Sequence, residues 1–147
     1  MHSFRDVETA AYCPRKLYYR RREQKEWETP DGVATLRELA FAYERILDGA
    51  DLDGVPIECP PTQVRTRLGQ AKARLDHWDR LADPAERDVF LSGRDCHGIA
   101  HKVLATDPPE ASLVFAGDPP ERGVWHPQSV RLMAVAKALS WEHSVEV

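Results

Sequence analysis

The pair Cys13-Pro14 constrains this sequence most, because it divides the stretch FRDVETAAYCPRKLYYRRR (residues 4–22) into two parts. Proline fixes its own φ, lacks an N–H and disfavours helical backbone at the residue before it. We therefore expect a short helix that ends before Cys13 and a second helix with Pro14 at its first position. Ser3, followed three residues later by Asp6, fits an N-terminal cap for the first helix.

The second of these helices is strongly basic. Residues 15–25 contain one acid, Glu23, and six basic residues: Arg15, Lys16, Arg20, Arg21, Arg22 and Lys25. On a helix, Leu17 and Tyr18 can face inward while the basic side chains reach solvent. Two interpretations stay open: a cationic surface that binds nucleic acid, or a solvated amphipathic helix that follows a buried structural cysteine.

Length and charge limit the function classes. A chain of 147 residues is long enough for one domain with a real core, so residues 1–147 are expected to form a single domain. The net charge of −4 excludes global nucleic-acid binding and requires a local patch. No apolar run approaches the roughly 20 residues that span a membrane. Three widely separated cysteines, an odd number, favour a reducing cytoplasm over a disulfide scaffold.

The rest of the chain is expected to be α/β, with helices followed by a small mixed sheet of about three to four strands and a closing helix. Hydrophobic periodicity predicts helices over residues 35–47, capped by Thr35 and Glu38, and over residues 62–81. Strands are expected over residues 88–95, 98–105 and 111–116, and a further strand from residue 144. Pro127 starts the closing helix, whose expected inner face carries Val130, Met133, Ala134, Ala138 and Trp141.

The predicted helix over residues 62–81 also has basic side chains on its outer face: Arg65, Arg67, Lys72, Arg74 and Arg80. Such a face is either a second contact to a nucleic-acid backbone or a solvated helix surface.

Cys13, Pro14, Arg15, Lys16, Leu17, Tyr18 and Tyr19 together resemble the N-terminal signature of the CRISPR-associated RecB-like exonucleases. This resemblance implies a PD-(D/E)XK nuclease core, Mg²⁺- or Mn²⁺-dependent cleavage of DNA, most often single-stranded, and integrase proteins as partners in spacer acquisition. It implies that Cys13 is one ligand of a [4Fe–4S] cluster whose other three cysteines lie near the C-terminus. Because such a cysteine segment is not present here, we expect a shortened form of the family domain.

The resemblance fails at the family's catalytic positions. Where a glycine is followed three residues later by the first metal-binding Asp, this chain has Gly98 and His101. Where the family has Glu-x-Lys-x-Gly, it has Leu113 and Phe115 before Gly117. The expected His-Glu pair is Tyr43-Glu44, and the expected Gln-x-x-x-Tyr motif is Arg131 and Val135. The nuclease site is therefore expected to be degenerate.

Two other metal sites can be considered. Asp95, His97 and His101 fall on one side of an extended segment, and two imidazoles with a carboxylate can bind Zn²⁺ or a similar metal. The only thiolates are Cys13, Cys59 and Cys96, whereas a [4Fe–4S] cluster usually takes four.

These patterns predict a RecB-like relative that binds DNA through Arg15, Lys16, Arg20, Arg21 and Arg22 without cleaving it. One alternative is an active exonuclease that uses a displaced carboxylate such as Asp95. Another is a protein-interaction domain whose basic helix binds an acidic partner.

Overall fold

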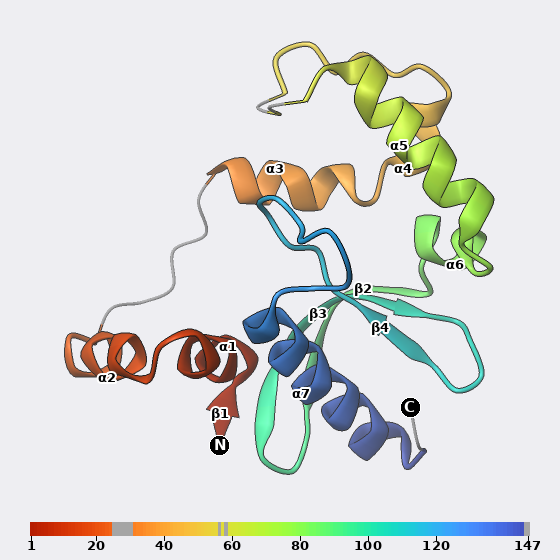
Figure 1. Cartoon of the computed structure of the whole chain (residues 1–147). Coiled ribbons are helices and arrows are strands. Elements are labelled where there is room, and N and C mark those ends of the chain that lie inside the picture. The colour runs from red at the N-terminus through yellow and green to blue at the C-terminus, as the bar shows by residue number, and fades with distance from the viewer. Residues whose placement is uncertain (25–30, 56, 58, 146–147) are drawn as a thin grey trace. The chain divides into compact units, whose positions relative to one another are not determined.

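The computed structural model describes residues 1–24, 31–55, 57 and 59–145, and shows an α/β fold (Figure 1). Its helices are α1 (Phe4–Tyr12), α2 (Pro14–Arg22), α3 (Asp31–Leu39), α4 (Tyr43–Leu47), α5 (Pro61–Arg74), α6 (Trp78–Ala82) and α7 (His126–His143). Its strands are β1 (His2–Ser3), β2 (Glu86–Ser92), β3 (Cys96–Leu104) and β4 (Glu110–Ser112). Packing divides the chain into two compact units: residues 1–27 with 85–147, and residues 28–84.

The first unit is built around a small mixed sheet in which β3 is the central strand. On one side β3 pairs antiparallel with β2, with Phe90 opposite Ile99. On its other side it pairs parallel with β1 at its beginning and antiparallel with β4 at its end. Helices α1 and α7 pack against each other and against this sheet (Figure 1). The expected mixed sheet is confirmed, and β1 is a strand that the sequence pattern did not reveal.

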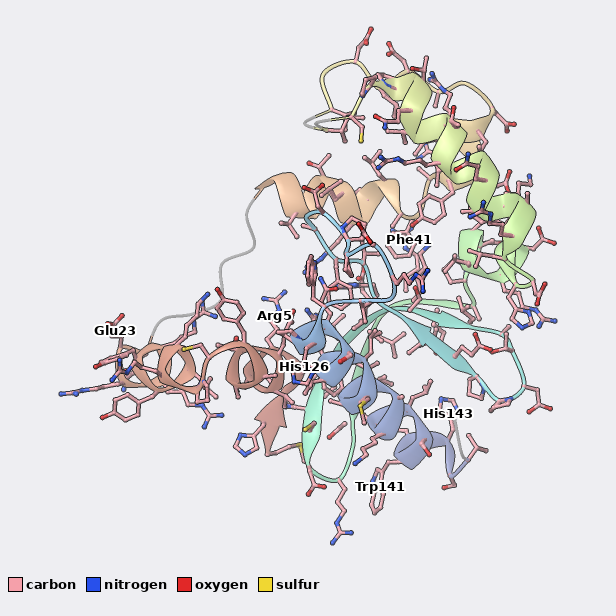
Figure 2. The ribbon with its side chains drawn as sticks, in the orientation of Figure 1. Arg5, Glu23, Phe41, His126, Trp141 and His143 are labelled. Carbon is pink, nitrogen blue, oxygen red and sulfur yellow. The ribbon has the colours of Figure 1, made fainter. Side chains whose placement is uncertain are left out.

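The core of this unit lies where the sheet meets the two helices. It contains Phe4, Leu91, Ala100, Val103, Ala134, Val135, Ala138 and Leu139. On α7 the buried residues recur at three- and four-residue spacing, which is one face of a helix. The predicted inner face was wrong for two large residues: Met133 is 62% exposed and Trp141 is 60% exposed. Figure 2 shows Trp141 projecting from the C-terminal half of α7.

Two glycines let these elements approach closely. A Cβ atom on Gly93 would lie 2.8 Å from the Ala138 Cα of α7. A Cβ atom on Gly98 would lie 2.6 Å from Cδ2 of the buried Phe4 ring, and Gly98 has φ +151°. Close contact of β3 with α1 therefore depends on the absence of a side chain on Gly98.

The N-terminal helices agree with the sequence prediction. Ser3 and Asp6 form a reciprocal capping box, with the Asp6 N–H 3.0 Å from Ser3 Oγ. Cys13 interrupts the helical path with φ −162° and ψ 107°, and Pro14 is the first residue of α2. The chain thus turns at the predicted position.

In the second unit, the two long helices that the sequence predicts are each divided into two. Residues 35–47 are divided between α3 and α4, because a turn at residues 40–42 buries Ala40 and Ala42. Helix α3 begins at Asp31, so Thr35 is not its cap. Residues 62–81 are divided between α5 and α6 by an extended Leu75, which precedes the buried Trp78. Helices α4 and α5 enclose a separate core of Ala42, Ile46 and Leu52.

The strand boundaries are also corrected. The turn between β2 and β3 is at residues 93–95, so Cys96 and His97 belong to β3 instead of the connection. β4 ends at Ser112, earlier than the predicted residue 116. At the end of the chain, Ser144 adopts a left-handed conformation (φ 52°) after α7 and Val145 is not in a strand. Residues 146–147 of the predicted last strand lie outside the described residues.

Lys102 on β3 is fully buried, which gives a testable dependence of stability on pH. Burial lowers the pKa of Lys102 from 10.5 to about 8, and the charge of Arg87, its partner on β2, adds to this effect. At a pH between these two pKa values, the Lys102 side chain binds more protons in the unfolded chain than in the folded chain. The free energy of unfolding should therefore rise with pH across this window, by about 1–3 kcal/mol from this group.

The measurement is chemical denaturation at about pH 7.5 and about pH 10, on either side of the window. The parent should gain more stability over this interval than Lys102→Met, which lacks the titrating group. Lys137→Met, at an exposed position of α7, should behave as the parent does. An equal gain in the parent and in Lys102→Met would contradict the assignment.

Candidate nucleic-acid interface

Helix α2 presents the most concentrated positive charge of the first unit. Its nine residues include five basic side chains and no acid, and none of its residues is buried. Three of the cations occupy the last turn, at Arg20, Arg21 and Arg22, where they also interact favourably with the helix dipole. A helix this polar contributes little to the core.

Basic and aromatic side chains alternate on the outer face of α2. Arg15, Tyr18, Tyr19 and Arg22 follow the three- and four-residue spacing of one helical face, and all four are exposed. The Tyr18 and Tyr19 rings meet edge to face, with centroids 5.4 Å apart. The prediction that Tyr18 faces inward was wrong, since it is 59% exposed.

A third exposed ring extends this surface onto α1. Tyr12, at the end of α1, is 70% exposed, and Lys16 Nζ lies 5.3 Å from the centroid of its ring. Cations bind phosphates, and exposed rings can stack on unpaired bases. We call Tyr12, Arg15, Lys16, Tyr18, Tyr19 and Arg22 the α2 surface.

The five cations that the sequence suggests as DNA contacts do not have equal roles. Arg21 Nη2 lies 3.1 Å from Asp6 Oδ2 and 2.9 Å from His2 Nδ1, so it fastens α2 to the N-terminal segment. Burial raises the pKa of Asp6, but hydrogen bonds from Arg21 and Ser3 outweigh it and lower the pKa overall. Arg20 is half-buried. Arg21 is also exposed but is engaged in these contacts, which leaves Arg15, Lys16 and Arg22 as the exposed cations of α2 outside this pairing.

Cys13 lies at the junction of α1 and α2, where its N–H donates to Thr9 O at 2.8 Å. It is half-buried and not in a disulfide, and the same holds for Cys59 and Cys96. Among the described residues, no three His, Cys, Asp or Glu side chains form a group that could hold a metal. The residues present therefore do not fit a [4Fe–4S] cluster, whose ligation by Cys13 is an implication of the resemblance alone.

The degenerate motif positions come together beside α1. His101 is buried, and its Nδ1 accepts a hydrogen bond from the N–H of Val114 at 2.7 Å. Val114 lies between Leu113 and Phe115, and the Arg131 guanidinium lies 5.6 Å from the Phe115 ring centroid. Three separate motif positions thus converge in space.

A partly buried ion pair completes this cluster. Arg131 is only 7% exposed, and its Nη1 lies 3.0 Å from Glu8 Oε2 on α1. Sequence reasoning did not identify Glu8, because its partner lies 123 residues further along the chain. A carboxylate held by a guanidinium is a poor ligand for a divalent cation. The cluster as it stands is therefore a structural contact between α1 and α7.

The remaining candidate positions have other contacts. Glu44 Oε1 accepts from Trp78 Nε1 at 2.6 Å, and Glu44 also pairs with Lys72 at 3.1 Å. These hydrogen bonds lower the pKa of Glu44. Tyr43 stacks on Trp78 with centroids 5.5 Å apart. Tyr43-Glu44 thus takes part in the packing of the second unit.

Asp95, His97 and His101 are not brought together as a metal site. Asp95 is exposed in the turn between β2 and β3, and its backbone oxygen accepts from the N–H of His2. His97 is half-buried and meets the Phe90 ring edge to face at 5.8 Å. Ile99 separates His97 from the buried His101 along the same face of β3, because strand side chains alternate.

No family model, no curated protein and no solved structure matches this chain. Within the part of the chain that the structure describes, no helix has the length and apolar character needed to cross a membrane.

Proposed function

We propose that this chain is a relative of the CRISPR-associated RecB-like exonucleases that binds single-stranded DNA and does not cleave it. The observation that carries the proposal is the α2 surface, where three exposed cations alternate with three exposed tyrosines. Phosphates of any sequence can contact the cations, and unpaired bases can stack on the rings. The seven-residue signature from Cys13 to Tyr19 lies largely on this surface.

The arrangement of the first unit supports the proposed PD-(D/E)XK relationship. A helix precedes three successive strands and a helix follows them, as the resemblance implies. The chain positions aligned with the family's metal, lysine and glutamine motifs meet at His101, Phe115 and Arg131. This proximity is what the alignment requires of the three positions.

The same cluster supports loss of cleavage. Mg²⁺ and Mn²⁺ require oxygen ligands, and hydrolysis of a phosphodiester needs a metal to activate water and stabilise charge. The aligned positions supply an imidazole, two apolar side chains and a cation. Integrase proteins, as partners in spacer acquisition, belong to this proposal through the resemblance alone.

The test measures binding and cleavage on the same single-stranded oligonucleotide. The parent should bind with an affinity that falls as salt rises, with a log–log slope of about −2 for three phosphate contacts. It should show negligible cleavage with Mg²⁺ or Mn²⁺. Cleavage that is lost in Asp95→Ala would instead favour an active exonuclease that uses Asp95 as its displaced carboxylate. Absence of binding at low salt would contradict the proposed binding of single-stranded DNA.

A further inference from the structure

Arg21 is an exposed cation of α2 that is already paired with an acid of its own chain. Its Nη2 atom lies 3.1 Å from Asp6 Oδ2, and its side chain is 49% exposed. The pair joins α2 to α1, and both helices belong to the first unit. The positive charge of Arg21 is therefore offset within the protein, although solvent and ligands can still reach the side chain.

The same guanidinium nitrogen also contacts the N-terminal strand. Arg21 Nη2 lies 2.9 Å from His2 Nδ1, and because a guanidinium has donors only, Nδ1 accepts this hydrogen bond. Asp6 Oδ2 in turn accepts a second hydrogen bond, from the N–H of Ser3 at 3.3 Å. Two acceptors therefore direct the Arg21 guanidinium toward the beginning of α1.

Arg21 lies at the border of the α2 surface. It follows the exposed Tyr18 by three residues, a spacing that makes side chains neighbours on a helix. A phosphate at the Arg21 guanidinium would lie beside the Asp6 carboxylate, and adjacent anions repel each other. Contact of Arg21 with phosphate therefore competes with its contact with Asp6.

The physical chemistry of the pair permits this competition. Burial raises the pKa of Asp6, but hydrogen bonds from Arg21 and Ser3 lower it overall, so Asp6 is a carboxylate at neutral pH. Water and salt screen an exposed ion pair, which therefore contributes little stability. A phosphate can replace such a partner once the opposing carboxylate charge is removed.

We propose that Asp6 weakens DNA binding by the α2 surface, because it holds Arg21 in an internal ion pair that prevents Arg21 from contacting phosphate. This inference rests on the proposed function, which supplies the DNA ligand. In the parent protein, the three exposed cations outside the pair contact phosphates. Removal of the Asp6 charge makes Arg21 a fourth contact.

The test variant is Asp6→Asn, which removes the charge and keeps an oxygen that can accept from the N–H of Ser3. Its matched control is Glu121→Gln, which removes the same charge from an exposed position of the first unit outside α1 and α2. Arg21→Gln is made alone and together with Asp6→Asn. Fluorescence anisotropy over a salt series measures binding to a single-stranded thymidine oligonucleotide, and circular dichroism checks that each variant folds.

Asp6→Asn should bind about fivefold more tightly than the parent at about 0.1 M salt, and its log–log slope should steepen by about 0.7, the value of one further phosphate contact. Asp6→Asn/Arg21→Gln should lose this gain and return to the parent's slope, because the fourth cation is absent. Arg21→Gln alone should keep the parent's slope. Glu121→Gln should match the parent in affinity and slope.

An unchanged slope in Asp6→Asn, with a parent that binds, overturns the inference and leaves the α2 proposal intact. Weaker binding by Asp6→Asn also overturns it, because the pair would then position α2 for DNA. A gain that persists in Asp6→Asn/Arg21→Gln overturns it as well, since the effect would not act through Arg21. A parent that binds no DNA at low salt overturns the proposed function and this inference together.

A second measurement depends neither on DNA nor on the folding of Asp6→Asn. NMR titration of the Asp6 carboxyl group gives its pKa in the parent and in Arg21→Gln. The pKa of Asp6 should be higher in Arg21→Gln, because the carboxylate loses a hydrogen bond and a neighbouring positive charge. An equal pKa in the two proteins would show that the pair does not form in solution, which overturns the inference.

Discussion

Neutralising the exposed cations of α2, in the variant Arg15→Gln/Lys16→Gln/Arg22→Gln, should weaken binding of single-stranded DNA by about 100-fold at about 0.1 M salt. Each phosphate contact to a single strand contributes a slope of about −0.7, so each is worth about fivefold at this salt concentration. The variant should retain the parent's stability, because none of the three side chains is buried. Fluorescence anisotropy over a salt series gives both the affinity and the slope.

A matched control distinguishes the effect of the α2 surface on DNA binding from the effect of the chain's net charge. Arg94→Gln/Arg122→Gln/Lys137→Gln removes the same charge from exposed positions of the first unit away from α2. This variant should bind within about threefold of the parent, because distant surface charges are screened at this salt concentration. If the control loses as much affinity as the α2 variant, the α2 surface is not the binding site.

Gly98→Ala should lower the free energy of unfolding by about 3–5 kcal/mol, the largest effect we expect from a single methyl group in this chain. The new Cβ would lie 2.6 Å from the Phe4 ring, and the backbone at φ +151° disfavours any side chain. Phe4→Ala should cost a similar amount, because it removes a fully buried ring. Urea denaturation of each variant measures these losses.

The double variant Phe4→Ala/Gly98→Ala tests the cause. Because truncation of Phe4 makes room for the new methyl group, the double variant should be less destabilised than the sum of the single variants. As a contrast, a Cβ atom on Gly69 in α5 would meet nothing within 4 Å. Gly69→Ala should stabilise the chain by about 0.5–1 kcal/mol. Additive losses in the double variant would contradict a clash between Phe4 and residue 98.

Local signals in the sequence predicted the parts of the fold that depend on neighbouring residues. The Ser3–Asp6 cap and the Cys13-Pro14 break act over a few residues, and the structure confirms both. Periodicity identified the helical regions but did not show where α3 ends and α4 begins. The separation coincides with burial of Ala42 in the core of the second unit, which is a tertiary effect.

The candidate site was predictable only in part. The basic character of α2 is visible in the sequence, but the role of Arg21 depends on Asp6 and His2, which α2 approaches only after the chain turns at Cys13. The exposure of Tyr18 could not be inferred either, since an apolar ring at that spacing usually faces a core. The Glu8–Arg131 pair joins residues from opposite ends of the chain, and no local pattern indicates such a contact.

Helix α2 is held in place mainly by polar contacts and by its covalent junction with α1, because none of its residues is fully buried. A nine-residue helix is also shorter than those that are stable alone in water. Small rotations or fraying of α2 therefore disrupt little apolar packing, mainly that of the half-buried Leu17, and cost little free energy. If the proposed binding of strands of any sequence holds, such compliance would let the same arginines and tyrosines follow a backbone whose spacing varies from one nucleotide to the next.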